Sequence, residues 1–178
     1  MVKYAAFLRG ISPLNPTMKN ERLREVFEHE GLENVQTVIS SGNVLFESET
    51  KDVDKLETMI EKALPEQLGF NSTTIILSEV ELKQVAEHSP FQSKPASEDI
   101  RWMVAFTKQK PKKDLPQSDN AKGFGILGVY ERAIYCRVDL SATKTPELMR
   151  WLEKTFSKEL TTRNWNTVER ILKKWGGS

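Results

Sequence analysis

The chain has 178 residues, 38% hydrophobic and 29% charged, a balance typical of a soluble globular protein with one large domain or two small ones. Its net charge is only +1, from 26 basic and 25 acidic residues, so overall charge does not direct it to nucleic acid or to membranes. Cys136 is the single cysteine, which excludes an intrachain disulfide and predicts a reducing, cytoplasmic location. No apolar run approaches the length needed to span a membrane, and Arg9 interrupts the N-terminal apolar stretch too early for a signal peptide.

The first half of the chain alternates between period-2 and helical apolar patterns. The predicted elements are, in order, a strand at 2–8, a helix that begins near Thr17 and stops at Gly31, strands at 35–39 and 44–46 around the turn 40–43, a helix that is capped by Asp52 and bent or ended by Pro65, and a strand at 73–77. The first strand is apolar on both faces, as is typical of a central, covered strand.

This β-α-β-β-α-β order predicts a ferredoxin-like fold, with antiparallel strands in the order 4-1-3-2 and helices on one face. We therefore expect an α+β protein whose first repeat covers residues 1–78. Ser78 and Glu81 have the spacing of a capping box, so residues 79–100 are predicted to be a short helix and a linker.

The second half follows the same pattern more weakly. The predicted elements are a strand at 102–106, a polar loop at 108–120 in place of the first helix, a hairpin of 123–129 and 134–138, a helix that starts at Thr145-Pro146, a short strand at Thr161-Thr162 and a closing helix at 165–174. We expect a tandem pair of ferredoxin-like repeats with antiparallel sheets plus a C-terminal helix, the second repeat covering 101–175 and a tail 176–178.

The predicted topology brings three distant turns to one end of the first sheet. Arg9-Gly10 follows strand 1, Ser41-Gly42-Asn43 joins strands 2 and 3, and Asn71-Ser72 precedes strand 4. Together they offer a guanidinium, an amide, hydroxyls and backbone N–H groups that glycine leaves accessible, a mixture suited to a carboxylate or phosphate. Each turn could also be purely structural.

A second group of candidates stands before the last helix. Arg163 and Asn164 precede that helix, whose N-terminal N–H groups favour an anion. The structural alternatives are a buried tether for Arg163, an N-cap for Asn164 and a core anchor for Trp165.

Three blocks of the sequence stand out, namely Leu8-Arg9-Gly10-Ile11, Val38-Ile39-Ser40-Ser41-Gly42-Asn43-Val44 and Thr162-Arg163-Asn164-Trp165-Asn166-Thr167-Val168. They resemble the signature of the "domain of unknown function 1697" family, a group of small, mostly bacterial proteins. The resemblance implies two ferredoxin-like repeats and no established activity. This chain departs from the family where residues 12–16 replace a glycine-rich, lysine-containing loop and where Ser40 replaces a common glutamine.

Other chemistry is sparse. His29 and His88 lack metal-ligand spacing to each other or to Cys136, so we predict no metal site and no cofactor. Cys136 alternates with apolar residues and is expected to point into a core.

The sequence therefore favours a binding module for a small anionic ligand, a nucleotide or a carboxylate, at Arg9 and the turn Ser41-Gly42-Asn43. One alternative is nucleic-acid binding through the basic and aromatic C-terminus, which contains Arg163, Trp165, Arg170, Lys173 and Lys174. Another is a scaffold or homodimer without a ligand. An enzyme ranks below binding because no general base of tuned pKa is evident.

Overall fold

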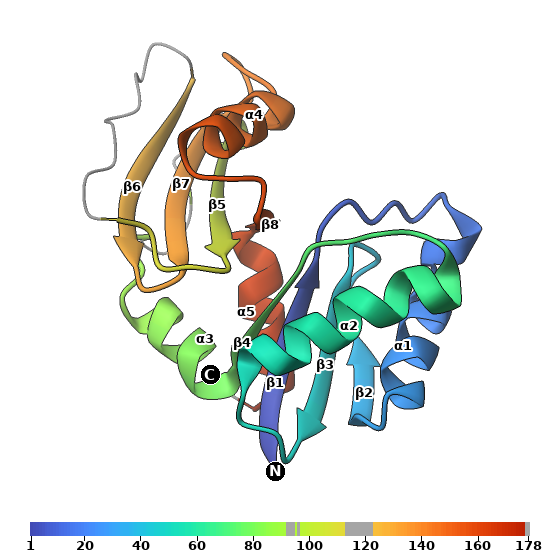
Figure 1. Cartoon of the computed structure of the whole chain (residues 1–178). Helices are drawn as coiled ribbons and strands as arrows, with labels where there is room; N and C mark the ends of the chain where they lie inside the picture. The colour runs from blue at the N-terminus through green and yellow to red at the C-terminus, as the bar shows by residue number, and fades with distance from the viewer. Residues whose placement is uncertain (92–94, 96, 113–122, 177–178) are drawn as a thin grey trace. The chain divides into compact units, whose positions relative to one another are not determined.

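The computed structural model describes all residues except 92–94, 96, 113–122 and 177–178 (Figure 1). The chain divides into two compact units, and each is treated by itself. The first unit consists of Met1–Lys83 together with Arg170–Ser178, and the second consists of Gln84–Glu169. Within the described residues the protein is α+β, with two four-stranded antiparallel sheets and five α-helices.

The sheet of the first unit contains β1 (Val2–Leu8), β2 (Glu33–Thr37), β3 (Asn43–Ser48) and β4 (Thr74–Ser78). Its order is β2-β3-β1-β4 with every neighbouring pair antiparallel, which confirms the predicted order 4-1-3-2. Strand β2 ends two residues earlier than expected. Ile39 has φ +58°, a left-handed conformation that takes the chain out of the extended strand.

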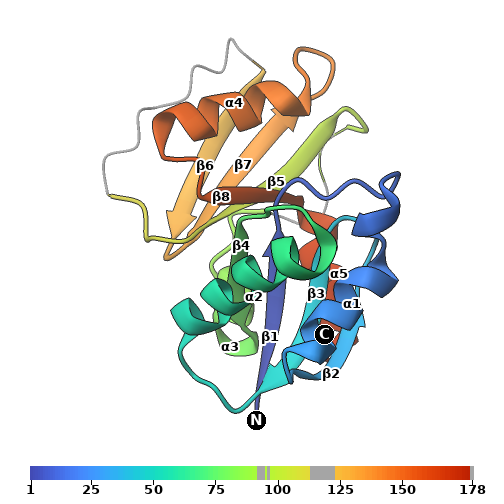
Figure 2. The same cartoon turned by 45° about the vertical axis from the view of Figure 1, so that its right-hand side comes forward.

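Two helices, α1 (Asn20–His29) and α2 (Val53–Leu68), lie on one face of this sheet (Figure 2). A short 3-10 helix, η1 (Pro16–Met18), precedes α1, so α1 begins later than Thr17. The Asp52 side chain accepts a hydrogen bond from the Lys55 N–H at 3.2 Å, as predicted for the N-cap of α2. Pro65 does not end α2, because the helix continues to Leu68 and stops where Gly69 adopts φ +79°.

The core of the first unit lies between the sheet and these helices. Strand β1 contributes Tyr4, Ala6 and Leu8, and the helices contribute residues at helical spacing; the buried helix residues in this cluster are Leu23, Val26, Phe27, Leu56, Ile60, Ala63 and Leu64. Ala5 and Phe7 point to the opposite face and are also buried, so β1 is covered on both faces as its sequence predicted.

The free side of edge strand β4 is satisfied by two carboxylates of α2. Glu57 Oε2 accepts from the Ile76 N–H at 2.8 Å, and Glu61 Oε2 accepts from the Thr74 N–H at 3.3 Å. Glu57 and Glu61 are four residues apart and so lie on one face of the helix, while Thr74 and Ile76 are two residues apart and so direct their N–H groups to one edge of the strand. Each carboxylate therefore reaches one of two successive outward-facing N–H groups. The helix thereby protects an edge that would otherwise be open to pairing.

Helix α3 (Glu79–Glu87) follows β4 and spans the division between the units. The capping box at its start is confirmed: Glu81 Oε2 accepts from the Ser78 N–H at 2.7 Å, and Ser78 Oγ accepts from the Glu81 N–H at 3.2 Å.

The sheet of the second unit contains β5 (Ile100–Thr107), β6 (Phe124–Tyr130), β7 (Ala133–Asp139) and β8 (Leu160–Asn164), in the order β6-β7-β5-β8. Helix α4 (Thr145–Thr155) covers one face of it (Figure 2). The core on that face includes Met103, Ile134, Cys136, Leu148 and Leu152. The closing helix α5 (Trp165–Lys174) has the predicted bounds. Most of the polar loop predicted at 108–120 lies outside the described residues.

Among the helices that the structure describes, none combines the length and apolar character needed to cross a membrane.

Candidate functional site

Three turns meet at one end of the first sheet, where β1 ends, β3 begins and β4 begins. The Leu8 N–H donates to Gly42 O at 2.9 Å, which fixes the β2–β3 turn beside the end of β1. The Arg9 N–H donates to Thr73 O at 2.9 Å, and Ser72 Oγ donates to Arg9 O at 2.7 Å. We name this region the first-sheet turns, consisting of residues 9–10, 40–43 and 71–73.

Asn43 organises the β2–β3 turn from within. Its side chain is 1% exposed, and its Nδ2 donates to Val38 O at 2.9 Å and to Ser41 Oγ at 3.0 Å. The Val38 N–H in turn donates to Asn43 O at 3.0 Å. A buried amide held by several hydrogen bonds fixes the loop geometry, and it holds the Ser41 hydroxyl in a defined position.

The two glycines of the first-sheet turns share a positive φ but differ in how closely other atoms pack on them. Gly42 has φ +82°, and a Cβ placed there would lie 2.7 Å from Ile11 Cγ1 and 3.0 Å from Leu8 O. Gly10 has φ +74°, but a Cβ there would meet nothing within 4 Å. Gly42 therefore permits close packing of the turn on the end of β1, whereas Gly10 leaves open space beside the backbone.

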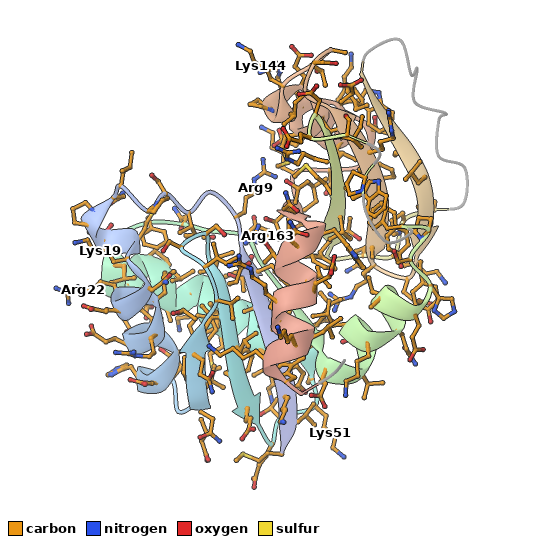
Figure 3. All side chains as sticks on the ribbon, turned by 180° about the vertical axis from the view of Figure 1, so that it is seen from behind. Arg9, Lys19, Arg22, Lys51, Lys144 and Arg163 are labelled. Carbon is orange, nitrogen blue, oxygen red and sulfur yellow. The ribbon has the colours of Figure 1, made fainter. Side chains whose placement is uncertain are left out.

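Exposure divides the predicted residues of this region into two kinds. Gly42 and Asn43 are buried, while Arg9 and Ser41 are half-buried and Gly10 is exposed. Arg9 lies at the end of the first sheet far from Lys51, which stands just before α2 (Figure 3). Arg9, Gly10 and Ser41 are therefore the residues of this set that solvent reaches, and Gly42 and Asn43 support them from beneath.

Arg163 and Asn164 belong to the second unit, in strand β8. Arg163 is 7% exposed, and its Nη1 donates to Thr161 Oγ1 at 2.7 Å and to Thr162 O at 2.8 Å. Burial lowers the pKa of Arg163 to about 10 because removal from water disfavours the charged form. These hydrogen bonds tie the guanidinium to its own strand.

The pairing of β8 with β5 places Arg163 on a particular face of the second sheet. Val104 stands opposite Arg163 on β8 and opposite Tyr135 on β7, so all three side chains share one face. This is the face opposite α4, since Met103, Ala105 and Cys136 belong to the core that α4 covers. Tyr135 is buried there and donates its hydroxyl to Val85 O at 2.6 Å. Burial raises the pKa of Tyr135.

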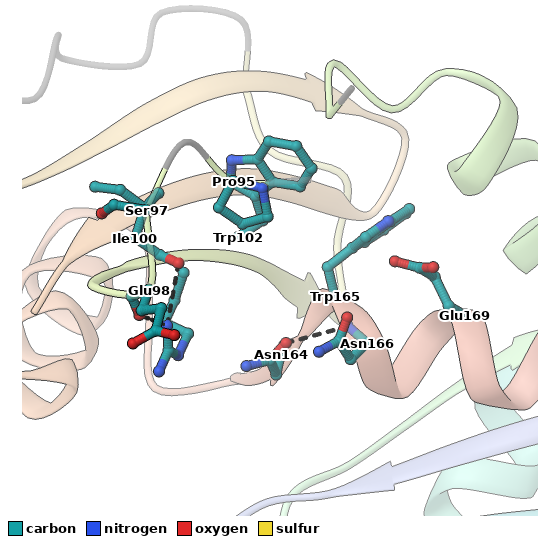
Figure 4. A pocket seen from close by; sticks show the side chains of 10 residues that line it. Pro95, Ser97, Glu98, Ile100, Trp102, Asn164, Trp165, Asn166 and Glu169 are labelled. Carbon is teal, nitrogen blue, oxygen red and sulfur yellow. Dashed lines mark hydrogen bonds between the residues drawn. The ribbon is translucent and has the colours of Figure 1, made fainter. Parts of the chain in front are cut away.

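Asn164 caps the start of α5, where its Oδ1 accepts from the Asn166 N–H at 3.1 Å. It also lines a cavity of about 420 Å³ in the second unit (Figure 4). We name this cavity the tryptophan pocket; its walls include Glu98, Arg101, Trp102, Asn164, Trp165 and Glu169.

Sequence reasoning missed most of the tryptophan pocket. Its residues come from the loop before β5, the first residues of β5, the last residue of β8 and the first five residues of α5. They converge because Met103 pairs with Asn164 across the β5–β8 ladder. No local pattern signals this convergence; only the expected antiparallel pairing of β5 and β8 could have suggested it.

The remaining reactive groups offer little for catalysis. Cys136 is buried, and burial raises the pKa of its thiol to about 12, which keeps it protonated and unreactive near neutral pH. No group of three or more His, Cys, Asp or Glu side chains in the described part of the chain is arranged to hold a metal ion.

The fold and these turns define a small α+β protein of two units, with a clustered set of polar turns on the first. The sequence profile of a family described as "Protein of unknown function (DUF1697)" matches residues 1–135, and the chain belongs to this family. No curated protein matches the chain.

One similar solved structure is that of the conserved bacterial protein SP0830 from Streptococcus pneumoniae. It shares 19% identity with this chain over 96% of each chain, with a TM-score of 0.66. At that identity the likeness concerns the fold alone.

Proposed function

We propose that the protein binds a small anionic ligand, carrying a carboxylate or a phosphate, at the first-sheet turns. The observation that carries this proposal is the set of hydrogen bonds that joins Arg9, Gly42 and Ser72 at one sheet end. These bonds hold the backbone of Arg9 at the same sheet end as a hydroxyl-bearing turn and the exposed Gly10. A guanidinium, hydroxyls and an accessible glycine are groups that suit an anion.

Arg9 provides the charge in this proposal, and Ser41 and Gly10 provide neutral donors. A preorganised turn reduces the entropy that ordering the site would otherwise cost on binding. Gly42 and Asn43 hold the turn in place, so their contribution to binding is indirect.

The test is a titration of the 15N-labelled protein with inorganic phosphate and with citrate at constant ionic strength, followed by NMR. We expect the amide signals of Gly10, Ser41 and Gly42 to shift in a saturable way. Arg9→Ala should weaken binding about tenfold or more, as expected for the loss of a charged hydrogen bond.

Lys51→Ala is the matched control, because it removes an exposed cation of the same unit at the opposite end of the sheet (Figure 3). Equal weakening in both variants would reveal a nonspecific charge effect and refute the proposed site. A lack of saturable shifts with either anion would refute it as well.

Arg163 and Asn164 stay predicted ligand residues, and they form a separate arm of this experiment. Arg163→Lys retains the positive charge but loses the planar guanidinium that bonds Thr161 and Thr162. If Arg163 only supports β8, this variant should lower stability and leave phosphate and citrate affinity unchanged. If Arg163 is a ligand residue, affinity should fall too.

Nucleic-acid binding through the C-terminus has less support. Trp165 is 8% exposed and packs edge-on against Phe91 and Tyr135, with ring centroids 5.0 and 6.2 Å apart, so it offers little surface for a base. Arg170, Lys173 and Lys174 are exposed. Salt-sensitive RNA or DNA affinity that Lys173→Ala and Lys174→Ala abolish would restore this alternative.

We further infer that the chain is a tandem pair of ferredoxin-like repeats with the predicted boundaries 1–78, 79–100 and 101–175. The shared strand order of the two sheets supports this inference. An alignment of homologues in which the two halves resemble each other no more than unrelated domains do would argue against it. The buried, protonated Cys136 is compatible with the cytoplasmic location that we infer from composition.

A further inference from the structure

None of the residues that line the tryptophan pocket belongs to the first-sheet turns, and all of them lie in the second unit. Its volume of about 420 Å³ is in the range of small-molecule sites. Figure 4 shows Trp102 and Trp165 on one side of it, Asn164 and Asn166 on another, and Glu98 and Glu169 at its two ends.

The aromatic wall of this pocket is preorganised. Trp102 stacks on Phe91 with ring centroids 5.0 Å apart and an interplanar angle of 9°. Phe91 also meets Trp165 at 5.0 Å and Tyr135 at 5.7 Å, both edge-on. Such contacts hold the indole of Trp102 in one orientation, although that side chain is still half-exposed.

The charges of the pocket favour a cation. Its charged lining residues are two carboxylates, Glu98 and Glu169, and one guanidinium, that of Arg101. The Arg101 Nη1 is directed to backbone carbonyls, donating to Glu98 O and to Ile100 O, the latter at 3.2 Å. One net negative charge therefore remains in the lining, beside the indole groups.

We propose that the tryptophan pocket binds a small organic cation, an ammonium group with apolar substituents such as a quaternary amine. The face of the half-exposed Trp102 indole that is not stacked on Phe91 attracts such a cation through its quadrupole, and the carboxylates add Coulomb attraction that an anionic ligand would not have. This inference goes beyond the anion site of the first unit and does not depend on it. Glu98 and Glu169 are exposed, so solvent screens them and binding should be weak and salt-sensitive.

The test uses choline and its neutral isostere dimethylbutanol, in which carbon replaces the quaternary nitrogen. NMR titration of the full chain should shift the indole N–H signal of the half-exposed Trp102, which a Trp102→Phe variant assigns. We expect half-saturation at millimolar choline and at least about fivefold weaker binding of the isostere, because only choline carries the charge.

The double variant Glu98→Gln with Glu169→Gln should weaken choline binding about threefold to tenfold and leave the isostere unaffected. Glu159→Gln is the matched control, since Glu159 is an exposed carboxylate of the same unit outside the pocket. Because Glu98, Glu159 and Glu169 are exposed, we expect the variants to stay folded, so that a change in affinity reports on the pocket and not on stability.

Equal shifts with choline and with the isostere would overturn the proposal and identify the pocket as merely apolar. Larger indole shifts with phosphate than with choline would overturn it in favour of an anion at the start of α5. Absence of any indole shift at tens of millimolar choline would overturn it as well.

Discussion

At the scale of single residues, the first-sheet turns show that one motif contains both supporting and accessible groups. Asn43 is buried and bonded to Val38 and Ser41, so its role in the fold follows directly from the geometry. Arg9 and Gly10 reach solvent, and nothing in the packing of Gly10 requires a glycine there beyond its positive φ. The sequence predicted that these residues would lie together, but it did not distinguish these two roles.

The two glycines provide a matched pair for stability. Gly42→Ala should lower the free energy of unfolding by about 3 kcal/mol or more, since strain from φ +82° adds to overlap with Ile11 and Leu8 O. Gly10→Ala should cost only about 1 kcal/mol, because it has the φ strain without the overlap. Urea denaturation of both variants measures the difference, and equal losses would show that the turn relaxes to admit the methyl group.

At the scale of elements, helix caps account for most of the boundaries that sequence predicted well. The Asp52 cap, the Ser78–Glu81 box and the Asn164 cap are each formed by hydrogen bonds within three residues. Local chemistry of this kind is independent of tertiary packing, so it can be recognised in sequence. Two boundaries differ from those predicted. Strand β2 ends early because Ile39 adopts a left-handed conformation, and α2 continues past Pro65 because the helix is packed into the core.

Helix α2 permits a controlled test of its cap. Asp52→Ala should reduce the free energy of unfolding by about 1 kcal/mol, because the Lys55 N–H loses its acceptor. Asp54→Ala removes an exposed carboxylate from the same first turn, and thus the same kind of helix-dipole interaction, without removing the N-cap residue. Thermal and urea unfolding should therefore show a larger loss for Asp52; a loss at Asp54 of equal size would mean that charge, and not the cap, stabilises α2.

At the scale of the whole molecule, two units of similar strand order contain different surface chemistry. The first presents polar turns with Arg9, and the second presents a pocket lined by tryptophans and carboxylates. The single thiol, Cys136, lies in the core of the second unit and serves as a native probe of its opening.

Reaction of Cys136 with a thiol reagent at pH 8 should be at least about a hundredfold slower in the native protein than in urea. Burial raises the pKa of the thiol to about 12 from an ordinary value of 9.0, so the folded state holds the proton more tightly. The stability that the neutral thiol contributes is therefore fully present below pH 9 and decreases as pH rises toward 12. Stopped-flow labelling measures the rates, and rapid native labelling would contradict the buried placement.

The sequence by itself determined the order of elements, the strand order of the first sheet, the main caps and the burial of Cys136, because periodicity and capping are local and strand order follows from short connections. Only the tertiary structure decided that Arg163 is buried against Thr161 and Thr162, and that Trp102 and Trp165 line one pocket. The burial of Arg163 and the cavity depend on residues about sixty positions apart that strand pairing brings together, such as Val104 with Arg163 and Met103 with Asn164. No local pattern encodes that pairing at the level of individual side chains.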